Sequence, residues 1–313
     1  MLDMPKSEMP IRSEPLPNAT AKVWGPYTQA ELDAQYNQMS AMSEAERQYH
    51  HHFKTTESAR VRAALAKTAL FDVAYGAGAS ERLDIFRPAP RKDSVTAPVQ
   101  IYFHGGAWKA GKKEDVSFMA EPFVDKGVMF VAVDYDHVPD VSLDEHIRQA
   151  RASVAWVYRN AANLGGDPER LFVSGHSSGG HVCATVAVTD WPSLYGLPAD
   201  VIKGAAPISG MYDLAPVRLS WRNNYLSLNR TAAERLSPIL QISERSLPMI
   251  VGYGTRELEE FKRQARDFAA AWRRSGHPCL EVELLGLNHF AVNHAFANPQ
   301  GPLLKAIFMQ MNV

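Results

Sequence analysis

The stretch FVSGHSSGGH, residues 172–181, contains the pattern Gly-x-Ser-x-Gly with Ser177 at its centre. A strand-like run, 170–175, leads into it, and a helical run begins at Ser178. A serine in so tight a strand-to-helix turn has a strained backbone, and the glycines two residues away on either side leave room for it. The turn lifts the hydroxyl above the sheet and directs the next helix's N-terminus at the reacting centre. The stretch therefore predicts that Ser177 is a nucleophile and that the backbone N–H of Ser178 binds an oxyanion.

Strand-like and helical runs alternate on both sides of this turn. The strand-like runs are 98–104, 128–135, 170–175, 202–209, 247–253 and 280–286, and helical stretches cover about 113–126, 143–163, 178–190, 258–275 and 290–311. Continuously apolar strands indicate a sheet buried on both faces, and the alternation with helices indicates a mostly parallel sheet. We therefore expect an α/β fold with helices on both faces of the sheet and an active site at the carboxyl ends of the strands.

The first 70 residues follow a different pattern. A polar, proline-rich arm is expected over 1–27 and a single domain over 28–313. The spacing of Thr28 and Glu31 fits a capping box, and helices are expected over about 28–39, 43–53 and 56–68. This 28–69 segment is expected to drape over the pocket. The run His50-His51-His52 fans around a helix and is read as solvated. Two antiparallel strands, FDVAY and ERLDIFRP, follow, the second ended by Pro88 and Pro90.

The loop His104-Gly105-Gly106-Ala107-Trp108 follows the strand 98–104. A tetrahedral intermediate needs N–H donors directed at its developing negative charge, and a loop with adjacent glycines can supply them. We predict an oxyanion hole in which Gly106, Ala107 and Ser178 donate and Gly105 permits the bend.

These motifs together resemble a known family. HGGAW, the run 141–181, the segment ISGMYDLAPVRLSWRNNYLSLN, GTRELEEFKRQARDFAAAW and LNHF are similar to the kynurenine formamidase (arylformamidase) branch of the α/β-hydrolases, close to hormone-sensitive-lipase-type esterases. The resemblance covers roughly 28–295. It implies an α/β-hydrolase fold and hydrolysis of an N-formyl aryl amide or small ester, with no metal and no organic cofactor. The sequence departs from the residues usual in this family at Ala107 and at Ser178-Gly179-Gly180. These departures leave the chemistry intact, but they leave the exact substrate open.

The general base is expected after the last strand, because the order in this fold is nucleophile, acid, histidine. His289 lies in that loop, and His294 falls inside the final helix. His176 is expected to line the pocket, and His181 to face the packing between helix and sheet. A zinc site at this pair would lack a third ligand.

The acid is expected just after the strand 247–253. The next helix has an apolar stripe at Phe261, Ala265, Phe268, Ala269 and Trp272. Asp267 lies about 240° from Phe261 and so faces water. Glu257 precedes the helix, and the resemblance also places the acid there, four residues before Phe261. Glu259 and Glu260 remain alternatives, and Asp213 is a less favoured one.

A cap-like insertion is expected over 210–245. Trp108, His176, Tyr212 and Trp221 are predicted to bind the substrate, which we expect to be a small aromatic amide or ester.

Composition excludes several functions. A net charge of −1 over 313 residues gives no reason to expect nucleic acid or an anionic membrane as partner. The apolar runs are too short to span a bilayer, and the first 20 residues have no signal-like apolar core. Cys183 and Cys279 have no metal-type spacing. We expect a cytoplasmic protein without cofactor or metal, and a homodimer is left open.

Two rival functions keep the same fold. A carboxylesterase or amidase acting on xenobiotic esters or carbamates would use every catalytic residue named above. A non-catalytic binding module would not need an intact serine, acid and histidine. A dinucleotide-binding protein is disfavoured, because no Gly-x-Gly-x-x-Gly follows the first strand.

Overall fold

The computed structural model describes residues 20–89, 96–244 and 247–313. Eight strands form one sheet in the order β10-β9-β8-β7-β5-β6-β4-β3. Their bounds are β3 Leu70–Ala74, β4 Arg82–Phe86, β5 Ala97–Phe103, β6 Met129–Val133, β7 Gly166–His176, β8 Ile202–Ile208, β9 Met249–Gly254 and β10 Cys279–Leu284. β4 pairs antiparallel with β3 and β6, and the other pairs are parallel. The expected α/β class with a mostly parallel sheet is confirmed.

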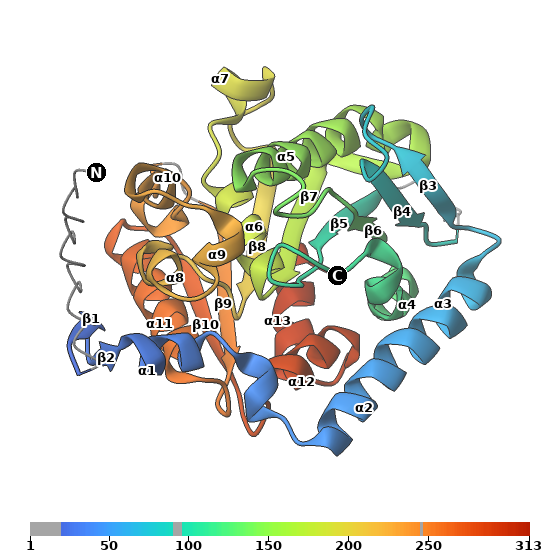
Figure 1. Cartoon of the computed structure of the whole chain (residues 1–313). Helices are drawn as coiled ribbons and strands as arrows, with labels where there is room; N and C mark the ends of the chain where they lie inside the picture. Colours follow the sequence, from blue (N-terminus) through green and yellow to red (C-terminus); the bar gives the residue numbers. More distant parts are fainter. Residues whose placement is uncertain (1–19, 90–95, 245–246) are drawn as a thin grey trace, which may run out of the picture.

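Helices cover both faces of this sheet (Figure 1). They are α1 Gln29–Gln35, α2 Glu44–His52, α3 Ser58–Leu65, α4 Ala120–Asp125, α5 Leu143–Asn160, α6 Ser178–Ala187, α7 Trp191–Tyr195, α8 Ala215–Leu219, α9 Asn223–Leu226, α10 Arg230–Arg235, α11 Glu259–Arg274, α12 His289–His294 and α13 Pro302–Met311. One buried apolar cluster joins α5, α6 and α11 to the sheet, and a second joins α3, α4 and α13 to it. Successive strand residues serve opposite clusters: Ile101 belongs to the first and Tyr102 to the second. The sheet is therefore buried on both faces, as its apolar strands predict.

The N-terminal segment runs along one side of the domain (Figure 1). Of the expected arm, residues 1–19 lie outside the described part, and β1 Lys22–Trp24 pairs with β2 Tyr27–Thr28. Thr28 and Glu31 form the expected capping box at the start of α1. A π-helical turn, Phe53–Glu57, joins α2 to α3. Among the described residues, no helix combines the length and apolarity needed to cross a membrane.

The expected single helix over 290–311 is wrong. α12 ends at His294 and passes through a 3-10 turn, Ala295–Ala297, and α13 begins at Pro302. The break follows from Pro302, which has no N–H to donate to a preceding turn and is suited to the first position of a helix.

Candidate active site

Ser177 occupies the turn between β7 and α6. Its φ of 60° and ψ of −124° lie in a region that side chains avoid, so the turn is strained. The flanking glycines are required by close backbone approach: a Cβ on Gly175 would lie 2.2 Å from the carbonyl oxygen of Gly179, and one on Gly179 would lie 2.1 Å from that of Phe103. The sequence therefore forces this turn through its glycines, and α6 begins immediately after the serine.

The structure brings Ser177, His289 and Glu257 into one hydrogen-bonded chain. Nε2 of His289 lies 2.8 Å from Oγ of Ser177, and Nδ1 of His289 lies 2.7 Å from Oε2 of Glu257. All three residues are buried, with at most 7% of the surface exposed. With Nδ1 protonated and donating to the carboxylate, Nε2 presents its lone pair to the serine hydroxyl. This arrangement can remove a proton from the serine and later return it to a leaving group.

Glu257 is held in the turn between β9 and α11. Its Oε1 accepts hydrogen bonds from the Ser209 hydroxyl at 2.5 Å and from the Gly254 amide at 2.7 Å, which leaves Oε2 for His289. Three donors on one carboxylate fix its position.

The other carboxylates considered from the sequence have different partners. Glu259 is exposed and pairs with Lys262, and Glu260 binds Arg263. Asp213 accepts from the Ala215 amide. Asp267 is exposed and pairs with Arg263, and the apolar stripe of α11 is buried, as expected.

Residues 105–107 of the loop after β5 line a cavity together with Ser177. The carbonyl of Gly105 accepts from the His104 ring, and that of Gly106 accepts from the Lys109 amide. Because C=O and N–H point in opposite directions across a trans peptide, the amides of Gly106 and Ala107 point away from these partners. Gly106, Ala107 and Trp108 all have positive φ, of 135°, 55° and 61°. Such a turn can direct successive amides to one point, as an oxyanion hole requires.

Two of the predicted substrate-binding residues are not in the cavity. Trp108 is 1% exposed and donates through Nε1 to Nδ1 of His181, because positive φ at Ala107 and Trp108 turns the indole into the core. Tyr212 is fully buried. Its hydroxyl donates to the Pro207 carbonyl, and its ring stacks on that of Phe268. Both are therefore packing residues, and their assignment to the substrate was wrong. His181 packs as expected: its Nε2 lies 2.8 Å from the Leu236 carbonyl.

The remaining two, His176 and Trp221, do line the cavity. Burial holds the pKa of His176 well below its usual range, so its ring is neutral. Its ring centroid lies 4.6 Å from that of His289, and within the described part of the chain its Nε2 has no hydrogen-bond partner.

The cavity has a volume of about 460 Å³ and opens onto Ser177 and His289. Its walls come from five parts of the chain: the N-terminal segment, the stretch 104–116 after β5, the turn at 176–177, the segment at 221–222, and α12. The sequence reading of His50 as solvated is wrong, because His50 lines this cavity and its Nδ1 lies 2.9 Å from Nε2 of His294. His294 therefore contacts α2, and the histidine that contacts Ser177 is His289.

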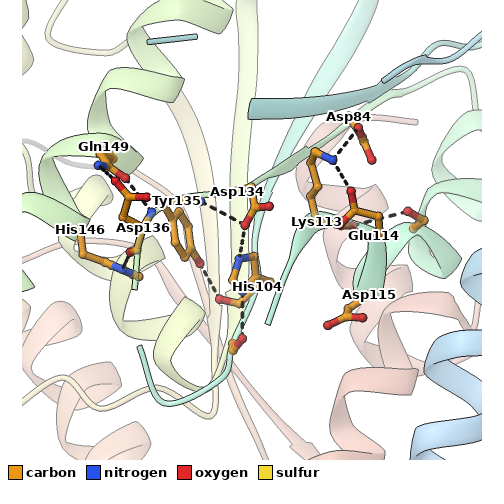
Figure 2. A network of polar contacts seen from close by, with 12 residues as sticks. Asp84, His104, Lys113, Glu114, Asp115, Asp134, Tyr135, Asp136, His146 and Gln149 are labelled. Atoms are coloured by element: carbon orange, nitrogen blue, oxygen red, sulfur yellow. Dashed lines mark hydrogen bonds and ion pairs between the residues drawn. The ribbon is translucent and has the colours of Figure 1, made fainter. Parts of the chain in front are cut away.

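A cluster with metal-ligand chemistry includes His104, which precedes the loop 105–107, and Figure 2 shows the polar contacts of two of its members, His104 and Asp134. One ligand atom each from His104, Asp134 and His137 falls within 4.8 Å of the others. Both ring nitrogens of His104 are already in contact, one with the Gly105 carbonyl and one with Asp134. A metal ion that used the His104 ring could bind here only by displacing one of these contacts.

Comparisons with known proteins identify a matching family and several relatives. The sequence model of the BD-FAE family matches residues 83–270. The chain is 32% identical to the kynurenine formamidase of Danio rerio over 276 residues, which is 86% of this chain and 92% of that protein. It is 37% identical to the kynurenine formamidase of Salmo salar over 69% of this chain and 71% of that protein. It is 29% identical to Esterase LipQ of Mycobacterium tuberculosis over 72% of this chain and 57% of that protein.

Solved structures show the same fold. A crystal structure of a candidate thioesterase from Silicibacter sp. superposes with a TM-score of 0.77 at 26% identity, covering 88% of this chain and 98% of that one. An esterase of Pyrobaculum calidifontis gives 0.64 at 20% identity, covering 88% and 94%, which bears on the fold alone. The α/β-hydrolase fold expected from the sequence is confirmed.

Proposed function

The chain belongs to the BD-FAE family, in the branch of the kynurenine formamidases, and is a hydrolase; we propose that it is a serine hydrolase that cleaves a small aryl formamide through an acyl-enzyme. The observation that carries this proposal is the chain of hydrogen bonds from Glu257 through His289 to Ser177. The relatives named as kynurenine formamidases support a formamide as substrate.

The reaction begins when His289 takes the hydroxyl proton as Ser177 attacks the formyl carbon. The resulting oxyanion accepts hydrogen bonds from the amides of Gly106, Ala107 and Ser178. His289, now an imidazolium stabilised by Glu257, gives its proton to the leaving arylamine. Water, deprotonated by the same imidazole, then releases formate from the formyl-enzyme and restores the serine.

A carboxylesterase acting on small aromatic esters is the second candidate, and the relative named Esterase LipQ favours it. The same residues would catalyse it, with an alcohol in place of the amine as leaving group. The choice between the two depends on the cavity, because the reacting atoms are shared.

The test compares kcat/KM on N-formylkynurenine and on para-nitrophenyl acetate, together with labelling by a fluorophosphonate probe. We expect hydrolysis of both with a preference for the formamide, labelling of Ser177, and loss of all three in Ser177→Ala. Ser174→Ala is the matched control, because Ser174 lies within β7 and its hydroxyl accepts from Gln100. A strong preference for the ester would favour the second candidate, and a wild-type protein that is not labelled would contradict serine catalysis.

A further inference from the structure

Three side chains with metal-ligand atoms meet at the carboxyl ends of two neighbouring strands. His104 follows β5, Asp134 follows β6, and the two strands are parallel partners with Phe103 opposite Val133. His137 lies three positions beyond Asp134. One ring nitrogen of each histidine and one carboxylate oxygen of Asp134 lie within 4.8 Å of one another. The strand register therefore brings together imidazole nitrogens and a carboxylate oxygen, which are common ligands of zinc.

The contact between His104 and Asp134 requires a cation. Nδ1 of His104 lies 2.9 Å from the carbonyl oxygen of Gly105, and a carbonyl only accepts, so Nδ1 carries the ring proton. Nε2 of the neutral ring then presents a lone pair to Oδ1 of Asp134, 3.2 Å away. Two acceptors at that distance repel each other unless a second proton or a metal ion lies between them. The distance also suits two ligands of one tetrahedral zinc ion, which are about 3.3 Å apart when each bond is about 2.0–2.1 Å long.

His137 favours a metal ion over a proton. A ring nitrogen of His137 belongs to the cluster, and its Nε2 is buried with no hydrogen-bond partner among the described groups. Buried polar atoms nearly always have a partner. A proton between His104 and Asp134 would give the ring of His137 nothing to bind, whereas a metal ion can bind all three residues.

The charges around Asp134 also favour a metal ion. In the part of the chain that the structure describes, no lysine or arginine lies within ion-pair distance of this carboxylate, and its basic neighbour is His104. The contrast is Asp84, drawn in the same close-up (Figure 2), which pairs with Lys113 at 3.3 Å. The Asp134 side chain is 18% exposed, so water can reach a fourth position on an ion bound here.

We propose that His104, Asp134 and His137 bind a Zn²⁺ ion, with water as the fourth ligand. The ion replaces the direct contact between His104 and Asp134. The other ring nitrogen of His104 already donates to a backbone carbonyl, as that of a zinc-bound histidine usually does. That carbonyl belongs to Gly105, so the ion fixes the start of the loop 105–107. The proposed reaction at Ser177 gives this ion no step, so the site goes beyond the proposed function and is tested without substrate.

Zinc titration of the full chain tests the site. The protein is treated with EDTA, dialysed and titrated with ZnSO₄ in a calorimeter, and we expect one equivalent to bind. His137→Gln and Asp134→Asn should each weaken this binding at least about 100-fold, because losing a ligand costs more than losing an outer-shell partner, which costs about 10- to 100-fold. Excess Zn²⁺ should raise the thermal midpoint of the wild type and of neither variant, since the unfolded chain lacks the site.

The matched control removes two histidines elsewhere on the surface. His51 and His52 are exposed neighbours on α2 and offer zinc a different binding place. The double variant His51→Gln, His52→Gln should keep the one-equivalent site at wild-type affinity. Co²⁺ in place of Zn²⁺ gives a second readout: the intense visible absorption of tetrahedral Co²⁺ should appear in the wild type and in the control, and it should be lost in His137→Gln.

Three results would overturn the proposal: a wild type that binds no equivalent of Zn²⁺, an affinity that survives both His137→Gln and Asp134→Asn, or a site that disappears with the substitutions at His51 and His52. If Asp134→Asn fails to fold, as circular dichroism would show, His137→Gln decides, because His137 is only half-buried and lies outside the helices and strands.

Discussion

Nε2 of His289 lies 2.8 Å from Oγ of Ser177, although the two residues are 112 positions apart in the chain. The sheet makes this contact possible. Ser177 follows β7 and His289 begins α12 beyond β10, so both lie beyond the carboxyl ends of parallel strands, and Glu257 follows β9 between them.

Replacing Glu257 by Gln keeps the shape of the side chain and removes its charge. The imidazolium formed during the reaction then loses its counter-charge, and the amide can favour the wrong ring tautomer. We expect kcat to fall about 10²- to 10⁴-fold. The measurement is steady-state hydrolysis of the formamide and the ester. Glu259→Gln is the control, because Glu259 is exposed and pairs with Lys262, and it should stay within about twofold. A Glu257→Gln enzyme with near wild-type kcat would refute the role of this carboxylate.

Gly106→Ala should disable the loop 105–107, which we propose forms the oxyanion hole. A Cβ there would lie 1.8 Å from the carbonyl oxygen of Ala110, so the loop must move and its amides lose their alignment. We expect kcat to fall at least about 100-fold, the scale of one lost oxyanion donor. Gly196→Ala is the matched control: Gly196 also has positive φ, of 62°, but its Cβ would meet nothing within 4 Å. If both variants lost activity equally, backbone strain alone would explain the effect and the loop would have no special role.

Asn288 connects α12, which begins at His289, to the N-terminal segment. Its Oδ1 caps α12 by accepting from the amides of Phe290 and Ala291, and its Nδ2 donates to Glu46 on α2. Asn288→Ala should lose the cap, about 1 kcal/mol, and lower the thermal midpoint by a few degrees. Asn288→Ser keeps a capping oxygen and should recover most of that stability.

The two Asn288 variants separate the cap from the link to α2. We expect both to lower kcat, since both lose the contact with Glu46 that holds α2 against α12. Glu46→Gln, measured beside them, keeps an oxygen that can accept from Asn288 and should lower kcat less. Wild-type kcat in Asn288→Ser would show that the link does not position His289.

The free energy of unfolding should decrease as the pH is lowered below about 6.5. Burial lowers the pKa of His50 to about 3 and that of His294 to about 4, and it acts in the same direction on His146 and His181. The unfolded chain takes up these protons near pH 6.5, well before the folded chain does. The neutral forms therefore contribute stability that is complete above about pH 6.5 and is lost toward pH 4.

Urea unfolding midpoints at pH 7, 6 and 5 measure this effect. His294→Gln removes one titrating group, so its midpoint should change less steeply with pH than that of the wild type. If the urea midpoint changed equally with pH in His294→Gln and in the wild type, the assignment of this pH dependence to His294 would be contradicted.

The serine and histidine of the proposed catalytic triad could be predicted from the sequence because each lies in a local motif. Gly175 is needed because a Cβ there would lie 2.2 Å from the carbonyl oxygen of Gly179, four residues on, so the motif itself records this contact; the contact of Gly179 with Phe103 forms only in the folded chain. The spacing of apolar residues likewise predicts the buried strands and the buried face of α11. The turn at Ser177, the sheet around it and the position of His289 after the last strand follow from these signals.

Only the tertiary structure decided where side chains outside these motifs point. Positive φ at Ala107 and Trp108 turns the indole into the core, whereas a motif alone suggested a pocket wall. His50 reaches His294 because α2 packs against α12, which lies more than 200 residues later. Arg222 and Tyr36, which are 186 positions apart, meet at the cavity wall only in the folded chain. Periodicity and turn chemistry record contacts between neighbours in sequence, whereas a cavity wall depends on which distant segments meet there, and no short stretch encodes that.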